Sequence, residues 1–177
     1  MFPNVLRNMF GAKLKLIPGF PGGADVVLAV ERGELDGRCG WSWSSVVSRN
    51  KAMFDSKQVI ATIQISLKKH PDLPDVPLVT EFARNQGELD ALKLILSRQA
   101  MARPFAAPPG IPEDRVRALR AAFDATMKDP EFLAETVKTD LEVQPVTGQE
   151  ITALIAELYR SPKDVVELAK KATADAN

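Results

Sequence analysis

The sequence predicts an α/β fold, in which strands alternate with helices along the first half of the chain. Residues 13–17, KLKLI, alternate in polarity with period two, and the turn sequence PGFPGG follows them directly. Residues 59–67, VIATIQISL, are rich in the β-branched side chains that buried strands favour. Between these segments, apolar side chains recur at helical spacing. Together these observations indicate βα units built on a parallel sheet.

The first hundred residues are expected to contain five helices and three strands. A short amphipathic helix ending at Gly11 precedes the strand at 13–17, and a helix over 24–32 ends at Gly33. GRCGW, residues 37–41, follows directly and is interpreted as a second strand, parallel to the first. The remaining expected elements are a helix at 43–54, a strand at 59–67 and helices at 76–84 and 86–97. The prolines of KKHPDLPDVP, residues 68–77, predict a stiff connection.

The last third of the sequence predicts helices and one strand. The segment ARPFAAPPG is extended, and the helix after Pro112 has an apolar stripe of Val116, Leu119, Phe123 and Met127. DPEF begins another helix, LEVQPV at 141–146 forms a strand, and Thr147 with Glu150 has capping-box spacing. A helix over SPKDVVELAKKA closes the chain. We divide the sequence into residues 1–100, an α/β lobe with its crossing segment, and residues 101–177.

Composition excludes several classes of function. Lys plus Arg and Asp plus Glu both total 23, so no basic field favours a nucleic-acid partner. No apolar run approaches the roughly 20 residues of a membrane-spanning helix. The N-terminus lacks the pattern of a secretion signal. The single cysteine, Cys39, provides neither an internal disulfide nor a thiolate metal site, and we expect no metal and no cofactor.

The stretch from Gly19 to Ser45 suggests a phosphate cradle or a nucleophile site. Its glycines at 19, 22 and 23 fit neither GxGxxG nor the P-loop. GWSWS, residues 40–44, is nearly the GxSxG of a nucleophile elbow, with Ser42 as nucleophile, His70 as base and Asp55 as acid. The last glycine of that motif is replaced by Ser44, and His70 is favoured as a surface residue of the proline-rich connection. A serine acyl hydrolase using Ser42 remains an alternative hypothesis.

A ligand-binding edge is the third interpretation of this stretch. In the expected sheet, Gly22, Gly23, Trp41, Ser42 and Trp43 all follow strand ends, where ligands bind in open α/β sheets. The amides that begin the helix after Gly22 suit a small anion or polar acid. Arg38 lies on an expected buried strand and requires an acidic partner from the protein or from a ligand.

The sequence resembles the substrate-binding proteins of tripartite tricarboxylate transporters, the Bug family. The likeness extends from about Phe2 to Lys171, through PGFPGGADVVLAVERGELDGR, KKHPDLPDVPLVTEFA and RPFAAPPGIPEDRVRALRAAFDATMKDPEFLAE. It implies a fold like the type II periplasmic binding proteins, with one largely complete α/β lobe and the C-terminal helices and strands of the other. It also implies a non-enzymatic, extracytoplasmic protein that captures a small carboxylate-containing ligand for a membrane permease or for sensing.

The resemblance assigns one wall of a binding cleft. Gly22 and Gly23 match the family's glycine pair, while Gly40, Trp41 and Ser42 stand where the family usually has an acidic or polar residue. Trp41 and Trp43 depart from the usual pattern and favour an aromatic or apolar-tailed acid. The expected ligand-binding residues are therefore six: Gly22, Gly23, Gly40, Trp41, Ser42 and Trp43.

The resemblance also implies a truncation. The family's signal peptide and first-lobe loops would lie before Phe2, so localisation is periplasmic by resemblance and cytoplasmic if the chain is expressed as written. A bare apolar surface would follow, and we expect a homo-oligomer to cover it. A remnant that has lost ligand binding and only self-associates is a further alternative.

Overall fold

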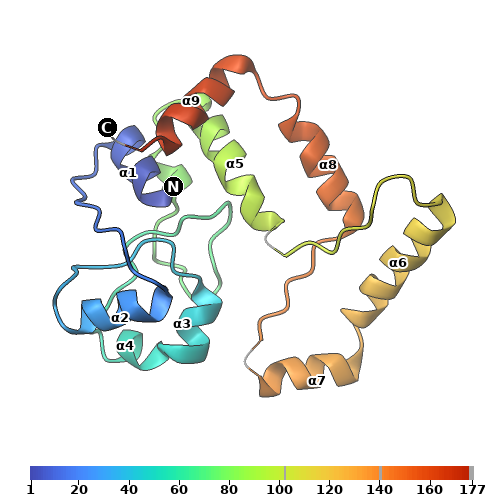
Figure 1. The fold of residues 1–177 in the computed structure, drawn as a ribbon, viewed down its shortest axis with the longest axis horizontal. Helices are drawn as coiled ribbons and strands as arrows, with labels where there is room; N and C mark the ends of the chain where they lie inside the picture. Colours follow the sequence, from blue (N-terminus) through green and yellow to red (C-terminus); the bar gives the residue numbers. More distant parts are fainter. Residues whose placement is uncertain (102, 140, 176–177) are drawn as a thin grey trace.

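The regular secondary structure of the described residues is helical, and long irregular segments connect the helices. The computed structural model describes residues 1–101, 103–139 and 141–175 (Figure 1). Its elements, in order, are α1 (Phe2–Phe10), α2 (Gly23–Glu31), α3 (Trp43–Arg49), α4 (Lys51–Asp55), the 3₁₀ helix η1 (Val79–Phe82), α5 (Gln86–Ala100), α6 (Glu113–Thr126), α7 (Pro130–Lys138), α8 (Gly148–Leu158) and α9 (Lys163–Thr173).

The predicted α/β fold of the type II periplasmic-binding-protein kind is wrong, because the described residues form no sheet. Their one β-type pairing is an isolated parallel bridge between Gln64 and Leu78. It consists of the Gln64 N–H donating to the Pro77 carbonyl and the Val79 N–H donating to the Gln64 carbonyl. Segments 13–17, 37–41 and 141–146 are irregular instead.

The failed strands share one physical cause. Alternating polarity identifies a possible face of a strand, but a strand exists only where a neighbour completes its hydrogen-bond ladder. In segment 13–17, the strand prediction placed Leu14 and Leu16 in a core, but these side chains are 40% and 38% exposed. The β-branched segment 59–67 contributes only the bridge at Gln64. Local pattern therefore predicted extended backbone without predicting its partner.

The helices, whose signals are local, were predicted well. Gly11 ends α1 in the left-handed conformation, with φ at 67°, and the predicted capping box of Thr147 and Glu150 is confirmed. The expected helix at 43–54 breaks at Asn50 into α3 and α4. The helix expected at 76–84 is reduced to the single turn η1.

The hydrophobic core lies where α1, η1, α5 and α9 meet, and Figure 1 shows the three α-helices side by side. Its most deeply buried side chains include Val5, Val79, Leu92 and Leu96, each at most 2% exposed. Helix α9 supplies three further core residues, Val165, Ala169 and Ala172. The core thus combines helices from both predicted segments, 1–100 and 101–177.

Two asparagines of α1 join the ends of the chain. Asn4 is 2% exposed, and its side-chain amide donates to the Thr173 carbonyl at 3.3 Å and to Asp175 Oδ1 at 2.8 Å. The Asn8 amide lies 3.0 to 3.2 Å from three further carbonyls at the end of α9. The last carbonyls of a helix have no partner within it, so these amides satisfy groups that would otherwise need water.

An ion pair holds the start of α5 against the end of α1. The Arg84 guanidinium donates to the Glu88 carboxylate and to the Met9 carbonyl at 3.0 Å, and the Arg84 N–H donates to Glu88 Oε2 at 2.9 Å. Hydrogen bonds from Arg84 hold the pKa of Glu88 below its ordinary value. Within the described residues, no helix has the length and continuous apolar character required to span a bilayer.

Replacing Asn4 by Ala should destabilise the fold by about 1–3 kcal/mol, because buried helix-end carbonyls would lose their donor. The measurement is the free energy of unfolding in urea. Asn50→Ala is the control, since the Asn50 side chain makes no cap hydrogen bond. Equal destabilisation by the two substitutions would contradict the capping role of Asn4.

Acid should remove the stabilisation that Glu88 provides. Because the folded-state pKa of Glu88 is lowered, its contribution is complete above the unfolded value of about 4.3 and is lost as pH falls through the lower folded value. Glu88→Gln should therefore lower the melting temperature at neutral pH and flatten its fall below pH of about 4. Glu131→Gln, at the exposed start of α7, is the control for the loss of one negative charge. Parallel profiles for wild type and Glu88→Gln would disprove the assignment.

Candidate functional site

The six predicted ligand-binding residues lie at the beginnings of two helices, α2 and α3, and not at strand ends. Gly22 and Ser42 are the N-cap residues of these helices, and Gly23 and Trp43 are their first residues. Gly40 turns the chain between the two helices with φ at 78°, a conformation that favours glycine. Trp41 and Trp43 are half-buried, whereas Gly22, Gly23, Gly40 and Ser42 are exposed.

Arg38 connects the start of α2 with Trp41. Its Nη1 donates to the Gly23 carbonyl at 3.1 Å, and its guanidinium carbon lies 5.0 Å from the centre of the Trp41 ring. Such a position over an indole face is a cation–π contact. A Cβ atom at position 23 would lie 2.6 Å from Arg38 Nη2, so the approach depends on glycine.

The charge of Arg38 has no acidic partner among the described residues. Partial burial lowers the pKa of Arg38, and no neighbouring carboxylate of the described ranges offsets that effect. Arginine nevertheless stays protonated in proteins. The sequence predicted an acidic partner for Arg38, either from the protein or from a ligand. The described part of the protein supplies none.

Four aromatic rings extend from Arg38 along the surface, and we call them the aromatic row: Trp41, Phe54, Trp43 and His70. Phe54 from α4 lies between the tryptophans, with ring centres 5.7 Å from Trp41 and 5.5 Å from Trp43, both edge to face. His70 lies 6.0 Å beyond Trp43. Phe54 was missed from the sequence, although it follows Trp43 by roughly three helical turns, a spacing that places residues on one face.

Hydrogen bonds fix His70 at the end of this row. Its Nδ1 accepts from the Asp72 N–H at 3.2 Å, so the proton lies on Nε2, which donates to Glu142 Oε1 at 3.0 Å. The Asp72 carboxylate accepts from Trp43 Nε1 at 2.8 Å. His70 is therefore half-buried and hydrogen-bonded at both ring nitrogens, contrary to the surface position expected for it.

Gln64 organises the loop that contains His70. Its side chain is buried, accepts from the His70 N–H at 2.7 Å, and donates to the Leu73 and Val76 carbonyls at 2.7 and 2.8 Å. A side-chain amide can form four hydrogen bonds, and the Gln64 amide forms three of them. The proline-rich segment thus folds around one buried side chain.

The three residues of the hydrolase hypothesis are engaged elsewhere. Ser42 Oγ shares a hydrogen bond with Ser45 Oγ at 2.7 Å, and Asp55 pairs with Lys51 at 2.6 Å. Both ring nitrogens of His70 are occupied by Asp72 and Glu142. In the described ranges no hydrogen bond joins Ser42 to His70, so the relay that would activate a serine nucleophile is not assembled.

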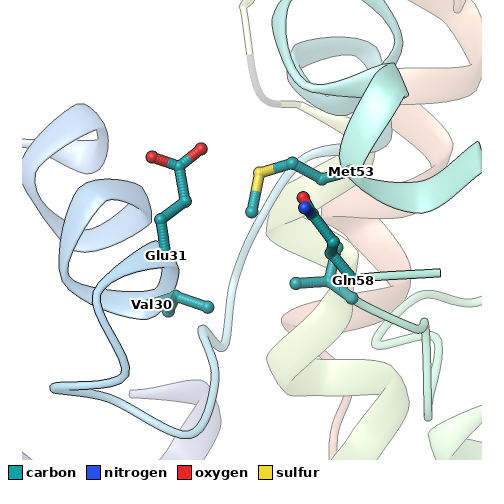
Figure 2. Close-up of a pocket in the computed structure, with 5 residues that line it drawn as sticks. Val30, Glu31, Met53 and Gln58 are labelled. Atoms are coloured by element: carbon teal, nitrogen blue, oxygen red, sulfur yellow. The ribbon is translucent and has the colours of Figure 1, made fainter. Parts of the chain in front are cut away.

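A depression of about 420 Å³ lies elsewhere, between α2 and α4. Figure 2 shows Val30 and Glu31 of α2 on one side and Met53 and Gln58 on the other; Val59 completes the lining. None of the predicted site residues contributes to it. Because Glu31 would repel a carboxylate, the surface at Arg38 suits an acidic ligand better than this depression. No cluster of metal-binding side chains occurs in the part of the chain that the structure describes.

Comparison with known proteins identifies no relative of the chain. No protein-family model, no curated protein and no solved structure shows a significant match to it.

Replacing Gly23 by Ala should displace the Arg38 guanidinium from Trp41, because the new methyl group would occupy the space of Nη2. The measurement is the tryptophan fluorescence and near-ultraviolet circular dichroism of the folded protein. Gly22→Ala is the matched control, since a Cβ there would contact Asp25 at an ordinary 3.4 Å. We expect a spectral change for Gly23→Ala alone; identical spectra for both variants would contradict the contact.

Proposed function

We propose that the chain captures a small carboxylate-containing ligand, and that Arg38 binds the ligand's carboxylate. The observation that carries this proposal is a guanidinium with no acidic partner among the described residues, placed beside the start of α2 and over Trp41. The resemblance to the tripartite tricarboxylate substrate-binding proteins supports the same ligand class.

The recognition chemistry follows from charge and from unpaired donors. Only Nη1 of Arg38 is used by the Gly23 carbonyl, which leaves other guanidinium N–H groups for a carboxylate. The positive end of α2 adds to the attraction, worth about 0.3–1 kcal/mol at an exposed position. Asp25, in the same first turn, opposes it with a charge of the ligand's own sign. The carboxylate is therefore expected on the Arg38 side of the turn.

The aromatic row indicates what the rest of the ligand is. Trp41 and Trp43 remain half-buried and provide flat apolar surface next to the cation. An aromatic or apolar-tailed acid would place its carboxylate at Arg38 and its body along these rings. A short polar dicarboxylate would gain only the charge interaction.

The proposed ligand is delivered to a membrane permease of the tripartite tricarboxylate type, or is sensed, outside the cytoplasm. Both partner and location are proposals that rest on the resemblance. The competing proposal is that the chain is a remnant that binds no ligand and only self-associates. The exposed apolar side chains of α6 to α8 support this alternative.

Titration of tryptophan fluorescence with phenylacetate, benzoate, succinate and citrate tests the proposal. We expect saturable quenching, strongest for the aromatic acids. Arg38→Gln should weaken binding roughly 10- to 100-fold, the value of a charge-assisted hydrogen bond of about 1.5–3 kcal/mol. Asp25→Asn should strengthen it, because a like charge is removed.

Arg32→Gln is the matched control, because Arg32 lies at the other end of α2, is exposed, and has Glu34, at 4.0 Å, as its ion-pair partner among the described residues. It should not change the affinity. Equal weakening by Arg32→Gln and Arg38→Gln would reduce the effect to net charge. No saturable response to any of the four acids would leave the self-associating remnant as the better explanation.

A further inference from the structure

The segment from α6 to α8 leaves an apolar surface that the rest of the described chain covers only in part. We call this the arm face and define it by its most exposed large side chains: Leu119 on α6, Val137 on α7, and Ile155 and Tyr159 on and after α8. They are 58%, 77%, 39% and 89% exposed, respectively. Figure 1 shows the three helices extending from the core formed by α1, α5 and α9.

The apolar stripe that the sequence predicts for α6 is only partly covered, since Leu119 is exposed while Phe123 contacts the Phe105 ring. Neither α6 nor α8 has a buried residue, although amphipathic helices in folded proteins usually bury one face. The two helices are linked by Arg120, which donates to Thr152 Oγ1 at 3.3 Å and to the Gly148 carbonyl at 3.5 Å. Polar contacts thus position α8 against α6, while Leu119 and Ile155 stay exposed.

The exposed area of the chain measures how much covering is missing. The chain exposes 12655 Å², whereas a compact monomer of 19.4 kDa exposes about 8,500 Å². The excess is roughly 4,000 Å², several times the ~800 Å² that each partner buries in a standard interface. A stable dimer therefore needs only part of the surface that the chain leaves bare.

We propose that a second copy of this chain covers the arm face, in a two-fold symmetric dimer. In such a dimer each copy presents the same surface, so the apolar side chains of one α6 and α8 meet those of the other. The formal net charge is zero, and long-range repulsion between copies is absent. Helix α6 also carries equal numbers of both charges, with Glu113, Asp114 and Asp124 against Arg115, Arg117 and Arg120.

Sedimentation velocity over a concentration series tests the dimer. We expect a monomer–dimer equilibrium with a dissociation constant in the micromolar range or below. Leu119→Glu and Val137→Glu should each raise that constant roughly tenfold or more, because a charge would be buried in an apolar interface. Ile60→Glu is the matched control, since Ile60 is 72% exposed but lies outside the arm face. Circular dichroism of each variant verifies that its helices remain folded.

A fluorine label places the interface. The chain has one tyrosine, so 3-fluorotyrosine gives a single resonance, at Tyr159. This resonance should shift with protein concentration, whereas 5-fluorotryptophan at Trp41 and Trp43 should not. A monomer at all concentrations, equal effects of Ile60→Glu and Leu119→Glu, or a concentration-dependent shift at the tryptophans alone would each overturn the proposal. A monomer whose arm face is protected only by a different protein would assign that face to a hetero-complex instead.

Discussion

The capping of α9 by α1 is the interaction on which the rest of the structure depends. Asn4 and Asn8 donate to carbonyls at the end of α9, and both helices pack with α5 around Leu92 and Leu96. The remaining chain forms two excursions, one between α1 and η1 and one between α5 and α9. Each excursion begins and ends on this core, so the entropy of closing both loops is offset where the chain ends meet.

The first excursion is held by polar contacts as well as by the buried side chains of Val27, Ala29, Val46 and Met53. Gln64 satisfies three groups of the loop that holds His70, and Arg38 donates to the carbonyl of Gly23. Such bonds are directional, so they position rings and charges without a large core. These fixed polar groups distinguish the Arg38 surface from the depression near Glu31, which lies between two helices.

The second excursion presents the opposite situation. Its helices have strong local signals, including the capping box of Thr147 and Glu150, yet they bury almost nothing. Capping and helix propensity stabilise a helix only weakly, and most helical stability in proteins comes from tertiary packing. A contact between the excursions, from His70 to Glu142, places the end of the aromatic row beside the segment that leads to α8. The ligand site and the arm face are nevertheless separate surfaces with separate tests.

The sequence specified most of the helices and several of their ends, because apolar spacing, Gly11 and the capping box act within a few residues. The sequence also placed Gly22, Gly23 and Trp43 next to helix starts, but it put the candidate site at the strand ends of a sheet that does not form. The local pattern could not predict that segments 13–17 and 59–67 form no sheet, since a strand depends on partners distant in sequence. The approach of Arg38 to Gly23 and the insertion of Phe54 between the tryptophans likewise depend on the tertiary structure. Each requires the chain to be folded before the contact exists.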